Sequence, residues 1–600
     1  MGSYQYKPLE KQHIRLLEVE PGTPESPLQG RFILHHIGEE LEYNALSYFW
    51  GCATLDHEIY ISLESQDSKQ SYSSLRITSS LHSALKRIRH RHEKIVLWAD
   101  AVCINQNDLP ELSEQVSIMR HIYSNAIKVL IYLGEEAEGS ELIPEVIQQL
   151  QSLQIPGLEK FSLPGNQPEF DHLLPALNGA KLTAFNSLFC RPWFTRLWVI
   201  QETVVAKDAI FLCGAWSEKL EVIEWALKLP FRHIRYGDPL SREAAREGKH
   251  ALLSLLAARD EYQKATEISQ RIPLMTLLST TRSCHVTKPV DRLYGILGIS
   301  SAADAPELQP DYTESMDQTL LRFYLYLLKN FSVYDLLRTA HISRWEPGQP
   351  TWIPSFTKRH SEAMWDYASD ENPSDCDAGR CSFQPHAALL NRSDINQFYA
   401  EIKGVPFDKV SEVGKDYRTS AIFTNGISET ESRNTVYKLI DEIHGMESAY
   451  YRTPQERFEA EWMTLIAGSN RARDYDCDVV YEMMQSRVPL PLQPENGCPE
   501  WSQYWMILAF VGAAIEAVGV LTTCQTRAGR LARVPYGTQP GDVIAVFPDM
   551  QVPLVLRERP EGQIGYLVVG ICYVHGIMNG EVFQNIDSLE HEMIRDFVLT

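Results

Sequence analysis

The sequence predicts an α/β fold in which a mainly parallel sheet, flanked by helices, occupies roughly the first third of the chain. Two observations support this prediction. Up to about residue 215, apolar runs of strand length alternate with stretches of helical periodicity, which is the pattern of βαβ units. From about residue 530, short β-prone runs are separated by Gly and Pro. They predict a small antiparallel sheet or barrel after a mostly helical middle region.

The elements of the first third follow from their periodicity. Near-continuous apolar runs suit strands that are buried on both faces of a parallel sheet. Apolar residues at every third or fourth position predict amphipathic helices instead. The expected strands are 43–48, 95–99, 129–133 and 209–213, and the expected helices are 78–89, 111–126 and 193–206. Residues 135–180 hold scattered Pro and Gly, and we expect an insertion or long connection there.

The length of 600 residues suggests about three or four structural units. We expect a first domain over 1–215, a helical region over 216–345, and a mixed accessory region over 346–600 with a barrel near 530–590. Helical periodicity is clearest at 252–262, 316–330 and 430–520. The β-like runs of the barrel are 542–547, 552–556 and 566–573, and a Pro- and Asp-rich loop is expected at 345–380.

The net charge of −22 argues against nucleic-acid binding, because such proteins usually carry a basic footprint. The one basic run, 86–92, lies at the end of an expected helix, where cations suit the negative end of the helix dipole. The longest apolar stretch, 506–521, is shorter than a membrane span and contains Glu516. It therefore predicts a buried helix and no membrane span.

Eleven cysteines without a C-x-x-C pair offer no zinc pattern. An odd number of thiols, behind an N-terminus that lacks an apolar signal segment, predicts reduced cysteines and a cytoplasmic location. Cys103 has no base partner nearby in the sequence, so we expect a buried thiol there. The sequence contains no P-loop, dinucleotide-binding, zinc-protease or serine-hydrolase motif.

Polar and aromatic side chains follow the first two expected strands. Ligands of an open parallel sheet bind beyond the carboxyl ends of its strands, so these side chains are candidates to share one crevice. The candidates are Ser47, Tyr48, Trp50, Asp100, Asn105 and Gln106.

Each candidate also has a structural alternative. Trp50 and Tyr48 are more often packing aromatics, although Trp50 could stack on a ring. Asp100 could accept from ribose hydroxyls or cap the next turn. Asn105 and Gln106 could instead satisfy backbone groups of their loop.

Three blocks of the first third together resemble the fungal heterokaryon incompatibility (HET) domain. They are YNALSYFWG at 43–51, LWADAVCINQ at 97–106, and RPWFTRLWVIQE at 191–202. Later segments are similar to companions of that family, including a C-terminal barrel of a common subclass. These segments are PVDRLYGILG at 289–298, PDY at 310–312, PTWIPSF at 350–356, QPGD at 539–542 and YVHGIMNGE at 573–581.

The resemblance implies a role in fungal self/non-self recognition, in which fusion of genetically different hyphae triggers programmed cell death. It also implies a TIR-like, flavodoxin-like first domain that acts by self-association or with another incompatibility protein. Some TIR domains cleave NAD, whereas others serve only as assembly surfaces. NAD is therefore a candidate substrate, and the alternative function is that of a NAD glycohydrolase.

Glu202 is the candidate catalytic residue, because its segment is similar to the helix that carries the catalytic glutamate of NAD-cleaving TIR domains. A carboxylate beside the ribose can stabilise an oxocarbenium-like transition state. The structural alternative is an ion pair with a nearby arginine such as Arg196 or Arg191. Arg196 lies six positions before Glu202 and so not directly beside it on a helix, which means that the pair would have to form through the tertiary fold. The forked guanidinium of either arginine also suits a phosphate. Asp291 is expected to cap the helix that begins near Arg292.

Overall fold

The chain forms two compact units, Met1–Arg322 and Phe323–Thr600. The sequence places domain boundaries near 215 and 345, whereas the contacts divide the chain once, inside a helix. The computed structural model describes residues 2–63, 71–152, 179–228, 239–341, 350–356, 378, 388–390, 399–418, 429–469, 476–487, 499–583 and 594–600. Most of the expected insertion at 135–180 and of the expected loop at 345–380 lies outside the described residues.

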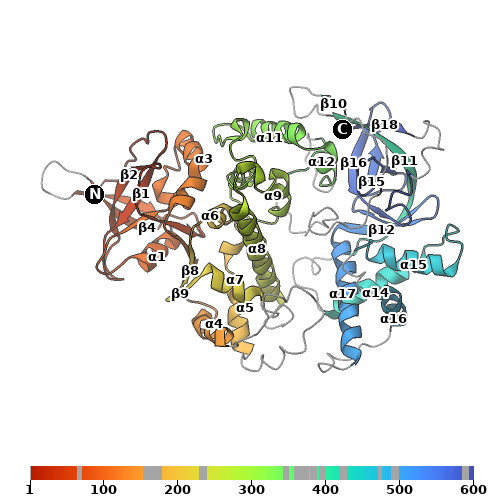
Figure 1. Cartoon of the computed structure of the whole chain (residues 1–600), viewed down its shortest axis with the longest axis horizontal. Helices are drawn as coiled ribbons and strands as arrows, with labels where there is room; N and C mark the ends of the chain where they lie inside the picture. The colour runs from red at the N-terminus through yellow and green to blue at the C-terminus, as the bar shows by residue number, and fades with distance from the viewer. Residues whose placement is uncertain are drawn as a thin grey trace. The chain divides into compact units, whose positions relative to one another are not determined.

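The first unit contains a nine-stranded sheet, flanked by helices that include α1 and α3 (Figure 1). Its centre consists of the four strands that the sequence predicts, all parallel and in the spatial order β6-β3-β7-β8. They are β3 (Asn44–Tyr48), β6 (Ile95–Trp98), β7 (Val129–Gly134) and β8 (Ala209–Cys213). Along the chain this order is 2-1-3-4, which matches the start of the flavodoxin-like order.

The prediction of a mainly parallel sheet is nevertheless wrong for the sheet as a whole, because five further strands make it mixed. β1 pairs antiparallel with both β2 and β6, while β5 and β9 close the two edges in antiparallel pairs. Only β2 and β4 add another parallel pair. Short connections favour antiparallel neighbours, since a parallel pair needs a long crossover. The added strands are β1 (His13–Val19), β2 (Gln29–His36), β4 (His57–Leu63), β5 (Ser71–Ile77) and β9 (Trp216–Lys219).

Two of the three helices predicted in this region form close to their expected bounds. Helix α1 (Ser79–Ile88) begins at Thr78, whose side chain accepts a hydrogen bond from the Leu81 amide. Helix α3 (Leu109–Asn125) begins in the same way at Asp108. Besides α6, which is treated below, the structure describes these further helices in the unit: α2 (Asp100–Cys103), α4 (Ile143–Ser152), α5 (Gly179–Leu188), α7 (Leu220–Lys228), α8 (Pro239–Lys264), α9 (Leu274–Thr280), α10 (Asp291–Leu297) and α11 (Met316–Asn330). Helix α11 continues into the second unit.

The third prediction, a continuous helix over 193–206, is wrong. The segment forms a 3₁₀ turn, η4 (Pro192–Thr195), and then α6 (Trp198–Val204), with extended backbone at Arg196 between them. At the break the chain pairs with His285: the Leu197 amide donates to the His285 carbonyl, and the His285 amide donates to the Thr195 carbonyl. This long-range pairing competes with the local helical bonds and separates Arg196 from the helix.

The second unit contains a closed barrel with helices inserted between its strands. β14, β15, β16, β18 and β11 pair in sequence, and β14 returns to β11. The prediction of a small C-terminal barrel is confirmed, but the long strand β11 lies outside the predicted range. The barrel strands are β11 (Tyr399–Val413), β14 (Val543–Val546), β15 (Leu554–Glu558), β16 (Tyr566–Ile571) and β18 (Arg595–Leu599). Off the ring lie β10 (Ala388–Leu390), β12 (Leu521–Thr526), β13 (Leu531–Pro535) and β17 (Tyr573–Val574).

Between β11 and β12 the described residues include four helices, which form a second core within this unit, as the helical periodicity of 430–520 predicts. They are α14 (Glu429–Gly445), α15 (Pro454–Leu465), α16 (Cys477–Gln485) and α17 (Pro499–Val520), and the short α12 (Val333–Leu337) precedes the barrel. The apolar run at 506–521 lies almost entirely within α17. Among the described residues, none of the helices has the length and apolar character that crossing a bilayer requires.

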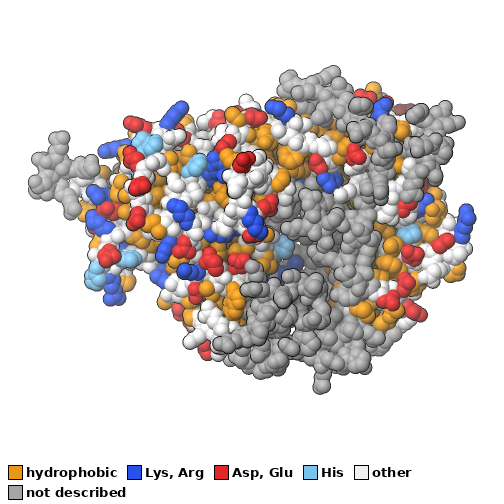
Figure 2. Space-filling model, in the orientation of Figure 1, with side chains coloured by type: hydrophobic (Ala, Val, Ile, Leu, Met, Phe, Trp, Pro, Cys, Tyr) orange, Lys and Arg blue, Asp and Glu red, His pale blue; other side chains and the backbone are white. Residues whose placement is uncertain are grey.

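Lys and Arg side chains are interspersed with Asp and Glu over the described part of the face shown in Figure 2. Within the basic run at 86–92, Arg87 and Arg89 donate to backbone carbonyls, Arg87 to Gly214 and Arg89 to Pro27. These two guanidinium groups therefore help to hold the fold together.

Helix α8 passes close to the backbone of Phe189 at Gly248. A Cβ atom there would lie 2.0 Å from the Phe189 carbonyl oxygen, so Gly248→Ala must displace backbone. We expect a loss of about 1–3 kcal/mol in the free energy of unfolding. Gly512→Ala in α17 is the matched control, because nothing lies within 4 Å of its Cβ position. Its helix should gain about 0.5–1 kcal/mol. Urea denaturation of both variants measures the difference, and equal stabilities would contradict the packing described.

Candidate functional site

The three HET-like blocks meet at the carboxyl ends of β3 and β6. Trp50, which follows β3, donates from its indole Nε1 to Asp100 Oδ2 at 2.9 Å. The Arg196 guanidinium donates to the Tyr48 carbonyl. Trp193 of the same block donates to the Ser47 hydroxyl at 2.7 Å. Each block therefore contributes at least one polar group to a single cluster.

Glu202 of α6 belongs to this cluster, and its side chain is only 1% exposed. Burial raises the pKa of its carboxyl to about 7, because the low-dielectric surroundings disfavour the charge. Arg196 opposes the shift by its positive charge, and Asp100 adds to it. The Ser47 hydroxyl lowers the pKa by hydrogen bonding. Glu202 is therefore close enough to Arg196, Asp100 and Ser47 for each of them to influence its carboxyl.

Asp100 and Tyr48 complete the cluster. Burial raises the pKa of the Asp100 carboxyl, while the positive charge of Arg196 and the hydrogen bond from Trp50 lower it. Burial also raises the pKa of the Tyr48 phenol well above its ordinary value, as does the negative charge of Asp100. Within the described part of the chain, the Tyr48 hydroxyl and Glu202 Oε2 are buried without a close hydrogen-bond partner. Such atoms are expensive to bury, and in native proteins they often mark functional positions.

Asn105 and Gln106 form hydrogen bonds within and beside their own loop, which is the structural alternative expected for them. The Asn105 amide donates to Glu111 Oε1 at 2.7 Å, and its side chain accepts from the Asn107 amide. The Gln106 side chain donates to the Asp100 carbonyl at 2.9 Å. Both residues therefore fix the loop that follows β6, and Gln106 does so through Asp100, a residue of the cluster.

The arginines near Glu202 are engaged by backbone carbonyls. Arg191 donates to the carbonyls of Glu135 and Ala137 at 2.9 and 3.2 Å. Arg196 bonds to the Tyr48 carbonyl, as described above. Among the ion pairs of the described residues, none joins Glu202 to an arginine. Arg196 therefore acts on Glu202 by its field and not by direct contact.

A third arginine, Arg259 of α8, fixes the far end of α6. It donates to the carbonyls of Thr203 and Ala206 at 2.6 and 2.7 Å and is only 8% exposed. A buried cation at the carboxyl end of a helix satisfies free carbonyls and complements the helix dipole. The short helix that carries Glu202 is thus anchored at its end by a residue of the helical region.

Three residues outside the predicted site behave as follows. Asp291 does not cap α10: the capping position is Val290, and the Asp291 carboxylate binds the side chains of Trp198 and Tyr312.

Cys103 is confirmed as a buried thiol, and burial raises its pKa to about 12. Tyr123 is not among the residues predicted for the site; its hydroxyl donates to the Leu46 carbonyl, and the negative charge of Glu202 helps to raise its pKa. Its position in the helix that follows the second block was the available signal.

The cluster contains two carboxyl groups, Asp100 and Glu202, and one guanidinium, Arg196. Burial raises the pKa of both carboxyls, and the positive charge of Arg196 lowers both. The arrangement can therefore hold or transfer a proton, or change its net charge when a ligand or partner binds. No group of three His, Cys, Asp or Glu side chains among the described residues is arranged to hold a metal ion.

Comparison with known proteins matches two segments to families. Residues 43–202 match the family described as heterokaryon incompatibility protein (HET), and residues 511–598 match the Het-6 β-barrel domain. Over 98% of its length the chain is 25% identical to "Heterokaryon incompatibility protein 6, OR allele" of Neurospora crassa, 96% of which is covered. No solved structure matches the chain significantly. These findings support a likeness to fungal heterokaryon incompatibility proteins, whereas the TIR relationship stays a prediction.

Proposed function

We propose that the chain is a heterokaryon incompatibility protein that recognises non-self after hyphal fusion and triggers cell death in a fungus. Its first unit is the effector, and it acts by assembly, either with copies of itself or with another incompatibility protein. The setting is the cytoplasm. The whole-length similarity to a heterokaryon incompatibility protein supports this role.

One observation carries the proposal. The segment that matches the HET family runs from Tyr43 to Glu202, and polar groups from its beginning, middle and end meet in one cluster around the buried Glu202. Burying the Glu202 carboxyl beside the half-buried Asp100 and Arg196 costs stability, and carboxyls with perturbed pKa values are concentrated at functional sites. The cluster is therefore the part of the first unit most suited to effector activity.

The test is a killing assay in a filamentous fungus that expresses the full chain from an inducible promoter. After fusion with a strain that carries a different allele, wild type should produce dead fusion cells that take up an exclusion dye. We expect Glu202→Ala and Asp100→Ala to reduce the dead fraction to that of an empty vector, because each removes one carboxyl of the cluster.

Glu145→Ala is the matched control, since this carboxylate of α4 is 53% exposed and lies outside the cluster. It should kill as wild type does. Immunoblotting shows whether all variants accumulate equally. Full killing by both cluster variants would reject the effector role of the cluster.

Cleavage of NAD is the second candidate function, and the raised pKa of Glu202 favours it, because a carboxyl that titrates near neutrality suits acid–base work. Its burial weighs against it, since a ribose must reach the carboxyl. Purified wild type and Glu202→Ala incubated with NAD distinguish the two functions. Nicotinamide release that is lost in the variant supports the enzyme, whereas killing without any release supports assembly alone.

A further inference from the structure

Helix α6, which carries Glu202, is fastened by residues that lie outside the HET-matching segment. Trp198, at the start of α6, donates from its indole Nε1 to Asp291 Oδ2 at 3.2 Å. The hydroxyl of Tyr312 donates to the other oxygen, Asp291 Oδ1, at 2.8 Å. One buried carboxylate of α10 therefore joins the Glu202 helix to a residue 114 positions further along the chain than Trp198.

The backbone of α10 is shaped to lie against α6. A Cβ atom at Gly295 would come within 3.1 Å of the Leu197 side chain. One at Gly298 would lie 2.5 Å from the Gln201 side-chain oxygen. Two glycines one helical turn apart thus permit the close approach that brings Asp291 to Trp198.

Tyr312 is held by several weak contacts and no covalent constraint. Its backbone amide donates a hydrogen bond to the Ser113 hydroxyl of α3 at 2.9 Å. Its ring packs edge-on against Tyr294 and lies under the Lys288 ammonium, 4.9 Å from the ring centre. Each such contact contributes about 1 kcal/mol or less, so the attachment of Tyr312 is reversible.

The Asp291 carboxylate makes this attachment easy to release. It is 7% exposed, and among the described residues it forms no ion pair, only hydrogen bonds with neutral donors. Burial raises its pKa, which the Tyr312 and Trp198 hydrogen bonds partly offset. Desolvation therefore opposes much of what the two hydrogen bonds contribute.

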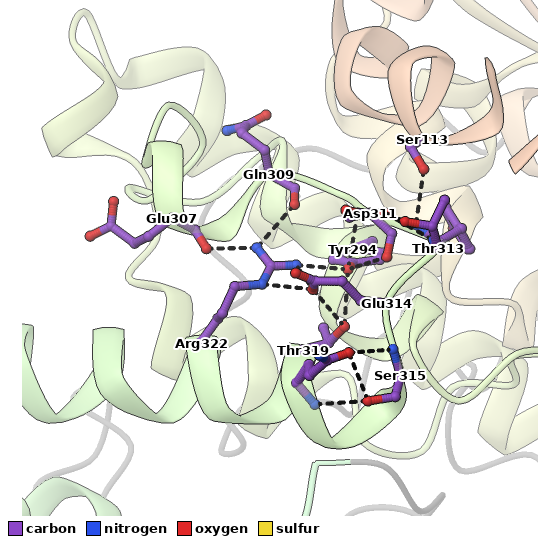
Figure 3. A network of polar contacts seen from close by, with 12 residues as sticks. Ser113, Tyr294, Glu307, Gln309, Asp311, Thr313, Glu314, Ser315, Thr319 and Arg322 are labelled. Atoms are coloured by element: carbon purple, nitrogen blue, oxygen red, sulfur yellow. Dashed lines mark hydrogen bonds and ion pairs between the residues drawn. The ribbon is translucent and has the colours of Figure 1, made fainter. Parts of the chain in front are cut away.

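A polar network around Arg322 of helix α11 includes Tyr294 and the residues on both sides of Tyr312, such as Asp311 and Thr313 (Figure 3). Arg322 of α11 donates to Glu314 Oε2 at 2.9 Å, to the Glu307 carbonyl at 2.7 Å and to the Tyr294 hydroxyl at 3.2 Å. Arg322 thus orders the loop on both sides of Tyr312. The same helix continues beyond Arg322 into the second unit.

We propose that Asp291 and Tyr312 form an autoinhibitory clamp on α6, which α11 can release. The clamp keeps Glu202 buried and out of reach in the resting protein. Displacement of α11 withdraws Tyr312 from Asp291 and loosens Trp198, so that α6 can move and the cluster becomes accessible. This inference rests on the proposed function, since it assigns a resting state to the effector cluster.

The first test is amide hydrogen exchange of the full-length protein. Tyr312→Phe removes one hydrogen bond to Asp291 and retains the ring, so it should speed exchange at α6 roughly five- to tenfold. Asp291→Ala removes both bonds and should speed it further. Tyr60→Phe is the control, because Tyr60 lies on β4 outside the clamp, and its α6 exchange should equal that of wild type. Unchanged α6 exchange in Tyr312→Phe overturns the proposal, even if Asp291→Ala fails to fold.

The second test is the killing assay without a partner of different allele. Tyr312→Phe should kill in unfused cells, where wild type does not, and adding Glu202→Ala should abolish that killing. Loss of killing by Tyr312→Phe after fusion would mean that the contact is needed for activity, and would overturn the inhibitory role. If wild type itself never kills, the proposed function fails, and α6 exchange alone decides whether the clamp exists.

Discussion

Arg15→Ala should destabilise the first unit by about 3–5 kcal/mol, because it leaves a buried carboxylate without its cation. Arg15 and Glu111 are 1% and 7% exposed, and Arg15 Nη2 donates to Glu111 Oε2 at 2.8 Å. Arg15 also donates to the Cys103 carbonyl. The pair joins β1 to the start of α3 and to the loop after β6, so its loss affects the scaffold of the strand tips. Urea denaturation followed by tryptophan fluorescence measures the change.

Two controls separate the buried pair from ordinary surface charge. Lys264→Ala breaks the ion pair with Asp260, whose partners are 73% and 66% exposed, and should cost less than about 1 kcal/mol. Combining Arg15→Met with Glu111→Leu should recover most of the loss, because no unpaired charge remains buried. A loss for Arg15→Ala as small as that for Lys264→Ala would refute the burial of this pair.

Glu202→Gln should stabilise the protein at pH 8 and leave its stability nearly unchanged at pH 4.5. The folded pKa of Glu202 is about 7, above the ordinary value of 4.5, so folding disfavours the charged form. Below 4.5 the carboxyl is protonated in both states and there is no penalty. As the pH rises to 7 the unfolded chain ionises first, and stability falls by roughly 3 kcal/mol. The uncharged amide escapes this loss.

Thermal unfolding of wild type and Glu202→Gln across this pH range gives the measurement. Glu145→Gln serves as the control, because this carboxylate is 53% exposed and lies outside the cluster. If Glu202 were instead held by an ion pair, Glu202→Gln would be the less stable protein at pH 8. That result would also exclude a buried, protonated carboxyl.

The central strands of the first sheet could be predicted because continuous apolar runs leave few alternatives. The flanking strands could not, since β4 and β5 mix polar and apolar residues, and their pairing depends on neighbours elsewhere in the chain. Strand β11 is 15 residues long and alternates charged with apolar positions, and a barrel strand of that kind gives a weak signal. The helix break at Arg196 depends on His285, a contact that local periodicity does not reveal.

Part of the candidate site could be predicted from the order of the parallel strands. Residues at the carboxyl ends of neighbouring parallel strands must lie close together, so Ser47, Tyr48 and Asp100 follow from the strand order. Glu202 could be chosen only through the family resemblance, because nothing in its local sequence fixes where α6 packs. The contact of Asp291 with Trp198 had no sequence signal, and its acidic side chain at a helix start suggested a cap instead.

The most direct test of the account is a titration of the Glu202 carboxyl in the intact protein. Isotope-edited infrared spectra of wild type, with those of Glu202→Gln subtracted, follow this carboxyl from the protonated to the ionised form. A buried group beside Asp100 and Arg196 should titrate with a midpoint of about 7. A midpoint near the ordinary value of 4.5 would place the carboxyl in water and contradict the cluster at the strand tips.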